Sequence, residues 1–367
     1  MSFELALIVP PYIQARVVMK KVIIAGAGCT LADCDRTSPT KKPPLDRGFF
    51  DRRPMTPYAS DLRMVADYIK THYGQELTAG GFNSLERVIA ILYADIFGGA
   101  LETQAFEAFR RLIRVFLRRL ANTTNPLKPS PRRPIYRLLS HSLEEVSEAE
   151  DLTIITFNQD IHLEKTLLRL STAYRWRRRV VFEFPDLYGV EFTNTTRPQS
   201  TRIFPESSGA SGGVSLLKLH GSLNWYSVHD REDPSREELF DPAKNIYVTR
   251  RTTLDHTMKY REKHTFPIVV PPVIHKAQVL HDRLKPSWEA AEVALKQADE
   301  VVIVGYSCPV TDWESANLIS RSLVSKPIRV SVIDPDPAVV IRYQSLGNLG
   351  HLSYFRTVSD YLTLSRR

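Results

Sequence analysis

The sequence predicts an α/β protein in which a parallel β-sheet carries helices on both faces. Short apolar runs alternate along the chain with longer segments whose apolar residues recur at helical spacing. The apolar runs, such as residues 22–24 and 301–304, are nearly continuous, which is typical of strands buried on both sides. The composition, 43% hydrophobic and 25% charged, is that of a globular protein. No apolar run approaches the roughly 18 residues that span a bilayer, so we expect no membrane association.

The first predicted strand occupies residues 20–25 and ends at Gly26-Ala27-Gly28. Residues 1–18, which include Pro10 and Pro11, are predicted to be an N-terminal extension. Residues 33–57 are polar and rich in proline, and we expect them to form a long functional loop.

A helical block follows this loop. Asn83 and Glu86 have the spacing of a capping box, and apolar residues repeat on one helical face over residues 85–96 and again over 109–120. Residues 122–134 are predicted to be the loop that closes the block. The sequence thus predicts an inserted helical module at residues 58–140, and a core made of residues 19–57 and 141–367.

Further strands are predicted in the rest of the core, at residues 152–157, 180–184, 216–219, 268–272, 301–304 and, as the last strand, 328–333. A Ser/Gly-rich linker is expected at 207–213 and surface excursions at 227–264. Thr311 and Glu314 have the spacing of a second capping box.

Cysteine content and charge limit the functional classes. Three cysteines without a Cys-x-x-Cys pair, Cys29, Cys34 and Cys308, provide neither a disulfide framework nor a zinc site, so we expect free thiols, a cytoplasmic protein and no metal. The formal net charge of +8 favours polyanions, but the basic residues are spread along the chain. Nucleic-acid binding therefore stays an open alternative.

Residues able to bind or react follow four of the predicted strands. The four sites are Gly26-Ala27-Gly28-Cys29, Asn158-Gln159-Asp160, His220-Gly221-Ser222 and Gly305-Tyr306-Ser307. Ligands of open α/β sheets bind beyond the carboxyl ends of the strands, so the four sites are expected to converge.

Each site has a functional and a structural interpretation. Gly26 and Gly28 allow a phosphate to approach the backbone, although Leu31 stands where a third glycine is usual, and an ordinary tight turn is the alternative. Asn158 and Asp160 suit hydrogen bonds to ribose hydroxyls or a positioned water, or they cap a turn.

His220 can accept a proton or polarise a hydroxyl near neutral pH, and the alternative is a structural histidine. Gly305, Tyr306 and Ser307 can bond a phosphate or a ribose. Asp334, which ends a strand, can accept hydrogen bonds from the hydroxyls of an adenosine ribose, or it is a turn residue before Pro335.

Taken in order, these motifs resemble the sirtuin-like family, in its bacterial defence-associated NADase branch. The matching strings are Ala25-Gly26-Ala27-Gly28, Thr156-Phe157-Asn158-Gln159-Asp160, Leu217-Lys218-Leu219-His220-Gly221-Ser222-Leu223-Asn224-Trp225, and Ile303-Val304-Gly305-Tyr306-Ser307 through Asp312. The His-Gly-Ser-Leu-Asn-Trp string is the most specific of them.

The resemblance implies a Rossmann-like NAD-binding core with an inserted smaller module. The implied roles are catalysis at the nicotinamide ribose by Asn158, His220 and Asp160, contacts to the pyrophosphate by Gly26, Ala27, Gly28 and Cys29, and contacts to the adenosine half by Gly305, Tyr306, Ser307 and Asp334.

The chain departs from sirtuin deacylases in lacking their four zinc-binding cysteines. The resemblance then implies that water attacks NAD, and that the chain is an NAD glycohydrolase acting as an abortive-infection (anti-phage) effector. We expect its activity to be gated by homo-oligomerisation or by a partner such as a HerA-type ATPase or another defence-system subunit. Two alternatives remain: an NAD-dependent protein deacylase, and an NAD or ADP-ribose sensor or nucleic-acid-binding module without catalysis.

Overall fold

The structure of the chain is a computed structural model. It describes residues 19–34, 49–51, 56–77, 82–99, 101–146, 148, 151–174, 188, 214–230, 247–248, 259–260, 263–270, 281–309, 312–324 and 326–365. The predicted extension at 1–18, strand at 180–184 and linker at 207–213, as well as Thr311, lie outside these residues.

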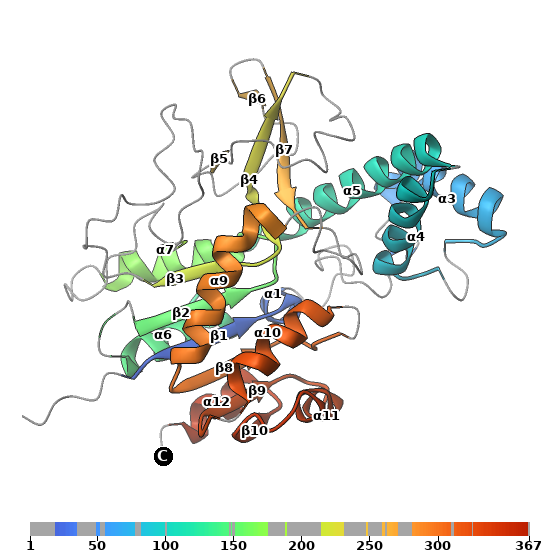
Figure 1. Cartoon of the computed structure of the whole chain (residues 1–367). Helices are drawn as coiled ribbons and strands as arrows, with labels where there is room; N and C mark the ends of the chain where they lie inside the picture. Colours follow the sequence, from blue (N-terminus) through green and yellow to red (C-terminus); the bar gives the residue numbers. More distant parts are fainter. Residues whose placement is uncertain are drawn as a thin grey trace, which may run out of the picture.

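A six-stranded parallel sheet forms the centre of the molecule (Figure 1). Its strands are β1 (Lys21–Ala25), β2 (Leu152–Thr156), β3 (Ser215–Lys218), β8 (Glu300–Val304), β9 (Arg329–Ile333) and β10 (His351–Phe355). They are ordered β10-β9-β8-β1-β2-β3. Counted along the chain within this sheet, that is the Rossmann order, and it reverses direction between β1 and β8. The predicted Rossmann-like α/β fold is confirmed.

Helices cover both faces of the sheet. On one face lie α1 (Ala27–Asp33), α6 (Pro134–Glu145), α7 (His162–Tyr174) and α12 (Val358–Leu364). On the other lie α9 (His281–Gln297), α10 (Trp313–Leu323) and α11 (Ala338–Ser345). Strand β1 shows how the sequence achieves this, because Ile23 points into the first core and Ile24 into the second. Successive side chains of a strand point to opposite faces, so a strand buried on both sides is mostly apolar.

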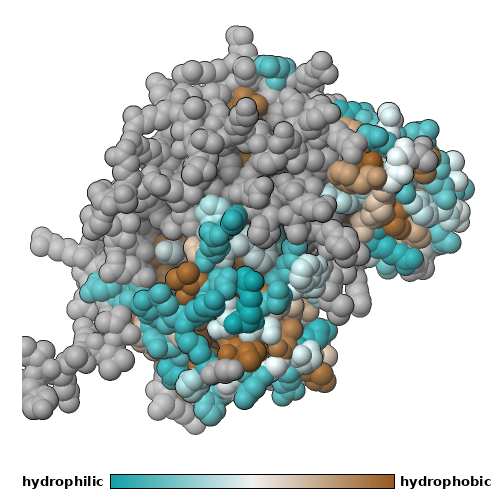
Figure 2. Space-filling model, viewed as in Figure 1, coloured by the Kyte–Doolittle hydropathy of each residue, from teal (hydrophilic) through white to brown (hydrophobic). Residues whose placement is uncertain are grey.

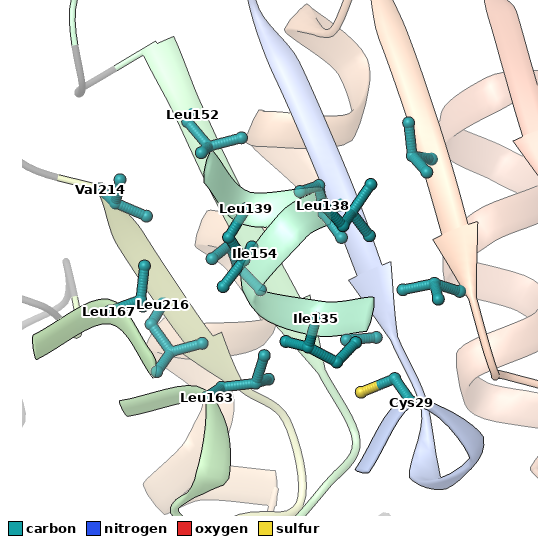
Figure 3. Close-up of a cluster of buried hydrophobic side chains, with 14 of the residues drawn as sticks. Cys29, Ile135, Leu138, Leu139, Leu152, Ile154, Leu163, Leu167, Val214 and Leu216 are labelled. Carbon is teal, nitrogen blue, oxygen red and sulfur yellow. The ribbon is translucent and has the colours of Figure 1, made fainter. Parts of the chain in front are cut away.

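Figure 3 shows the first of these cores, where Leu138 and Leu139 of α6 and Leu163 of α7 lie against Ile154 and Leu216 of the sheet. Cys29 of α1 points into the same cluster. Helix α6 packs against α1, α7 and α12 and thus forms part of the sheet-covering layer. The predicted module boundary at residue 140 falls inside this helix, and the division into domains remains a prediction.

The helical block forms an arm beside the sheet, at the right of Figure 1. It comprises the 3-10 turn η2 (Thr56–Tyr58), α3 (Ala59–Tyr73), α4 (Leu85–Gly98) and α5 (Glu102–Thr124). These helices share their own apolar core, which Ile161, Leu223 and Val269 connect to the rest of the molecule. On its outer surface the arm mixes hydrophilic and hydrophobic residues (Figure 2).

Two local predictions about the arm are wrong. The N-cap of α4 is Ser84, whose hydroxyl accepts a hydrogen bond from the Arg87 N–H at 3.2 Å, and not Asn83. Serine and asparagine are nearly equal N-caps, so the sequence does not separate neighbours. The predicted loop at 122–134 begins too early, since α5 continues to Thr124.

A second, antiparallel sheet was missed, and the surface excursions predicted at 227–264 are partly wrong. The sheet consists of β4 (Gly221–His229), β5 (Tyr247–Val248), β6 (Lys259–Tyr260) and β7 (Lys263–Val269), in the order β5-β4-β7-β6. Strand β7 replaces the strand expected at 268–272. Strand β4 buries polar residues, among them Ser222, Asn224 and Ser227, so it lacks the apolar run that marks a core strand.

Strand β10 was also missed, because residues 328–333 were expected to contain the last strand. It lies at the edge of the sheet and its five residues are exposed or half-buried, so its sequence carries little apolar signal. None of the described helices is both long and apolar enough to cross a membrane.

Candidate functional site

The register of the parallel strands brings the predicted residues to one edge of the sheet. Ala25, Thr156 and Lys218 pair across β1, β2 and β3, and Ala25, Val304 and Ile333 pair across β1, β8 and β9. Every predicted site residue follows one of these five aligned positions. The expected convergence at the carboxyl edge is therefore a consequence of the register.

Two glycine-containing loops cross at the point where the strand order reverses. The Gly26 N–H donates to the Val304 carbonyl at 3.0 Å, and the Gly28 N–H donates to the Gly305 carbonyl at 2.9 Å. A Cβ on Gly26 would lie 2.4 Å from the Gly305 oxygen, and Gly305, with φ of +58°, would place a Cβ 2.3 Å from the Cys29 nitrogen. The glycines are thus required by the contact between the two loops. Between them, Ala27 is exposed.

Asn158 and Asp160 are held in a hydrogen-bond network on the α1 side of the sheet. Asn158 Nδ2 donates to the Gly26 carbonyl at 2.9 Å and to Thr30 Oγ1 at 3.1 Å. Thr30 donates in turn to Asp160 Oδ2 at 3.0 Å. The other oxygen, Asp160 Oδ1, accepts the His162 N–H at 2.8 Å and so caps the start of α7. Asn158 therefore fixes the Gly26 loop, and the turn-cap interpretation of Asp160 describes its position.

Cys29 lies beside this network with its side chain in the core. Burial, followed by the nearby carboxylates of Asp160 and Asp33, raises the pKa of the Cys29 thiol far above its ordinary value. The thiol stays protonated at neutral pH and is no nucleophile.

His220 lies on the opposite side of the same strand ends, in an aromatic environment. Its ring centroid lies 5.2 Å from that of Phe157 and 6.3 Å from that of Trp288. The Trp288 indole N–H donates to the Leu219 carbonyl at 3.0 Å, which fixes this wall. His220 Nε2 lies 3.8 Å from Asp312 Oδ1. The His220 side chain is 10% exposed and its Nε2 faces the Asp312 carboxylate.

The residues after β8 and β9 complete the edge. The Tyr306 ring stacks on Phe157 with centroids 4.3 Å apart, and its hydroxyl donates to Asp312 Oδ2 at 2.8 Å. Ser307 is exposed. Asp334 Oδ1 accepts the Asp336 N–H at 2.9 Å, as expected of a turn residue, and burial raises the pKa of Asp334 above its ordinary value.

The structure thus divides the predicted residues into two groups. Asn158 and Asp160 lie with α1 and α7, whereas His220 and Tyr306 lie with α9 and α10. Phe157 and Asn158 are adjacent in the chain, and their side chains join opposite groups. The loop crossing of Gly26, Gly28 and Gly305 lies between the two groups.

Sequence reasoning missed several residues of this edge. Thr30 lies one turn along α1 from Gly26, and Phe157 precedes Asn158, but an isolated threonine or phenylalanine carries no functional signal. Asp312 stood inside a matching string without a role. A buried network below the edge was also missed: His162 Nε2 lies 2.7 Å from Asp33 Oδ2, and Lys218 Nζ donates to Glu164 Oε1 at 2.7 Å.

Among the described residues, the His, Cys, Asp and Glu side chains form no group of three or more that would hold a metal ion. Cys29, Cys34 and Cys308 are all buried and free.

Comparison with known proteins gave structural neighbours only; no protein-family model and no curated protein matches the chain. The neighbours are Sir2 proteins. One neighbour is a Sir2 enzyme from a study of the mechanism and regulation of these enzymes. It is 12% identical in sequence, the match covers 96% of this chain and 95% of the neighbour, and the TM-score is 0.39. A Sir2 homologue–NAD complex is 12% identical over 94% of this chain and 88% of its own, with a TM-score of 0.41. A Sir2 homologue in complex with 2′-O-acetyl ADP-ribose is 14% identical over 93% and 88%, with a TM-score of 0.40. With TM-scores of 0.39 to 0.41, these resemblances carry no conclusion about the function of this chain.

Proposed function

We propose that this chain is an NAD⁺ glycohydrolase, which cleaves NAD⁺ to nicotinamide and ADP-ribose. The observation that carries the proposal is the crossing of the Gly26–Gly28 and Gly305 loops at the switch point of a Rossmann-ordered sheet, with His220 and Asn158 on its two sides. Dinucleotides bind beyond the carboxyl ends of the strands at such a switch point.

The geometry suggests how the parts of NAD would be divided. We assign the pyrophosphate to the loop of Gly26, Ala27, Gly28 and Cys29, and the adenosine half to Gly305, Tyr306, Ser307 and Asp334. The N–H groups of Gly26, Gly28 and Cys29 donate within the protein, so the loop would approach the pyrophosphate through Ala27. Ala27 and Ser307 are exposed, and Asp334 is a mostly buried carboxyl whose pKa is raised by its burial. Tyr306 contributes through its backbone, since its side chain is engaged by Phe157 and Asp312.

The nicotinamide ribose is assigned to the strand ends that carry Asn158 and His220. Asn158 and Asp160 act by holding the Gly26 loop and the start of α7, because their side chains are bonded there. His220 accepts the proton of the attacking water. The C1′–N bond breaks with its electron pair passing to nicotinamide, the water oxygen bonds to C1′, and the proton is later released from His220.

We prefer hydrolysis over deacylation because sirtuin deacylases use four cysteines to bind zinc, whereas this chain has three, all of them buried. The cellular role proposed is that of an abortive-infection effector in the cytoplasm. Depletion of NAD is toxic, so we propose gating through homo-oligomerisation or through a HerA-type ATPase or another defence-system subunit.

The first prediction concerns the two groups of the site. Purified chain incubated with NAD⁺ releases nicotinamide and ADP-ribose without any peptide. His220→Ala and Asn158→Ala each reduce the rate by about 100-fold or more, as expected when a general base or a positioning group is lost. Product is measured by chromatography, and Asp95→Asn in the helical arm, where Asp95 accepts the hydroxyls of Tyr68 and Tyr73, is the matched control.

The outcomes separate the alternatives. Turnover that requires an acyl-lysine peptide would identify a deacylase. NAD binding without product, or retention on DNA that is lost with added salt, would identify a sensor or a nucleic-acid-binding module, which the +8 charge favours. Full activity in both variants would contradict the site assignment.

A further inference from the structure

Asp312 places a fixed carboxylate beside His220. It is the N-cap residue of α10 and is 5% exposed. Its Oδ1 accepts the Ser315 hydroxyl at 2.7 Å and its Oδ2 accepts the Tyr306 hydroxyl at 2.8 Å. One donor on each oxygen holds the carboxylate in a single orientation, with Oδ1 directed to within 3.8 Å of His220 Nε2.

Two of the side chains packed around His220 are uncharged aromatic rings. Phe157 and Trp288 provide aromatic contacts, and the Val270 N–H bonds the His220 carbonyl. Behind Asp312 lie Tyr306, Tyr343 and Cys308, which stay neutral because burial, as the main cause, raises the pKa of both tyrosines well above the ordinary value and that of Cys308 to about 11. The positive charge of Arg342 on α11 lowers the pKa values of Tyr343 and Cys308, but by less than burial raises them. Among the described residues, the charge that faces the imidazole is that of Asp312.

The support behind the carboxylate extends into the sheet-covering layer. Ser315 is fully buried on α10, and the Tyr343 hydroxyl of α11 donates to the Tyr306 carbonyl at 2.8 Å. Two helices therefore hold the tyrosine and serine that hold Asp312. Such a supporting shell is the arrangement that fixes a reactive group in its productive geometry.

We propose that Asp312 is a positioning residue that orients His220 and stabilises the imidazolium formed when His220 takes a proton. The proposal rests on the proposed hydrolysis. A separation of 3.8 Å is an ion-pair distance and exceeds that of a hydrogen bond, so Asp312 acts through its charge in this state. With Nε2 turned to Asp312, the proton from water passes to Nδ1 of His220 and is released from there after the product leaves.

The test combines spectroscopy and kinetics on Asp312→Asn, which keeps the size of the side chain and removes its charge. In protein with ¹⁵N-labelled histidine, the midpoint of the His220 titration moves to lower pH by about 1 unit or more, because an opposite charge at this distance favours the protonated form. The acid limb of the kcat profile for NAD⁺ hydrolysis moves in the same direction, and the plateau kcat falls about 10-fold or more while KM changes little.

Two further variants complete the test. Asp312→Glu keeps the charge and leaves the His220 titration midpoint within about 0.3 units of the wild type. If Asp312 had a structural role only, the midpoint would not depend on whether the substituted side chain is charged. If Asp312→Asn does not melt cooperatively, Asp312→Ser replaces it, since serine is also a favourable N-cap. Asp95→Asn again serves as the control, with an unchanged midpoint and an unchanged rate.

The outcomes are distinguishable. A folded variant without the charge whose His220 midpoint stays within about 0.3 units of the wild type overturns the proposal, as does a fall in rate that is equal at every pH. The titration requires no turnover. Absence of hydrolysis by every wild-type form would contradict the proposed function, and the midpoint would still decide whether Asp312 controls the proton on His220.

Discussion

Asn158, Asp160 and Asp334 show that single polar residues at a strand end have structural bonds as well as any role toward a ligand. The amide of Asn158 holds the Gly26 loop, Asp160 caps α7, and Asp334 accepts a backbone N–H in its turn. Sequence reasoning placed all three at the correct edge, because strand ends are visible in the apolar pattern. It could not show which hydrogen bonds they make, because the partners come from other segments of the chain.

Asp334 leads to a prediction about pH. Burial raises the pKa of its carboxyl in the folded state, so its ionisation opposes folding above that value, and the stability it provides is present at low pH and lost as the pH rises. Asp334→Asn keeps the Oδ1 acceptor for the Asp336 N–H and removes the charge. We expect the Tm to rise by roughly 1–2 °C at pH 7.5, while the difference vanishes near pH 4.

Thermal melts at the two pH values measure this effect. Asp67→Asn, which removes the charge of an exposed carboxylate on α3 of the helical arm, is the control and leaves the pH dependence unaltered. A lower Tm for Asp334→Asn at pH 7.5 would show that the ionised carboxylate stabilises the fold, contrary to this account.

At the scale of elements, the sequence predicts strands buried on both faces and misses those with a different environment. Strand β1 is apolar because both of its faces are covered, and it was found. Strand β4 buries serine and asparagine side chains, where Ser222 donates to Asn224 and Asn224 to Tyr188, and it was read as irregular. Strand β10 is an edge strand with half-exposed residues. Buried polar residues interrupt the buried apolar residues of β4, such as Trp225, and edge exposure weakens the apolar signal of β10, so periodicity detects neither strand.

The loop crossing is the element on which the proposed NAD site depends, and a substitution of Gly305 tests it. Gly305→Ala meets both a positive φ of +58° and a contact of 2.3 Å with the Cys29 nitrogen, whereas Gly74→Ala meets a similar φ of +63° with no atom within 4 Å. We expect Gly74→Ala to cost about 1 kcal/mol and Gly305→Ala to cost at least about 2 kcal/mol more.

Chemical denaturation measures the free energy of unfolding of the two variants. Both place alanine at a positive φ, but only Gly305→Ala also brings the new Cβ against the Cys29 nitrogen. NAD binding, measured by calorimetry on the folded fraction, is weakened in Gly305→Ala and unchanged in Gly74→Ala. Equal losses of stability in the two variants would show that the contact between the loops contributes nothing.

At the scale of the whole molecule, a Rossmann-ordered sheet presents its carboxyl edge between a helical arm and a second, antiparallel sheet (Figure 1). The core class and the edge that carries the site follow from the alternation of elements, because parallel connection aligns all strand ends. The second sheet could not be predicted, since β4 pairs with β5 and β7 over long sequence separations and β5 and β6 are only two residues long. The arm was visible because its helices are amphipathic and enclose a core of their own.

The central claim is that the edge formed by the loop crossing, Asn158 and His220 hydrolyses NAD⁺. The most direct measurement is the release of nicotinamide and ADP-ribose from NAD⁺ by the purified full chain, with the oligomeric state of each fraction monitored. The account predicts equal amounts of the two products from at least one assembled form, without peptide, and their loss in His220→Ala. Nicotinamide release from no assembled form, or release that survives His220→Ala unchanged, would contradict it.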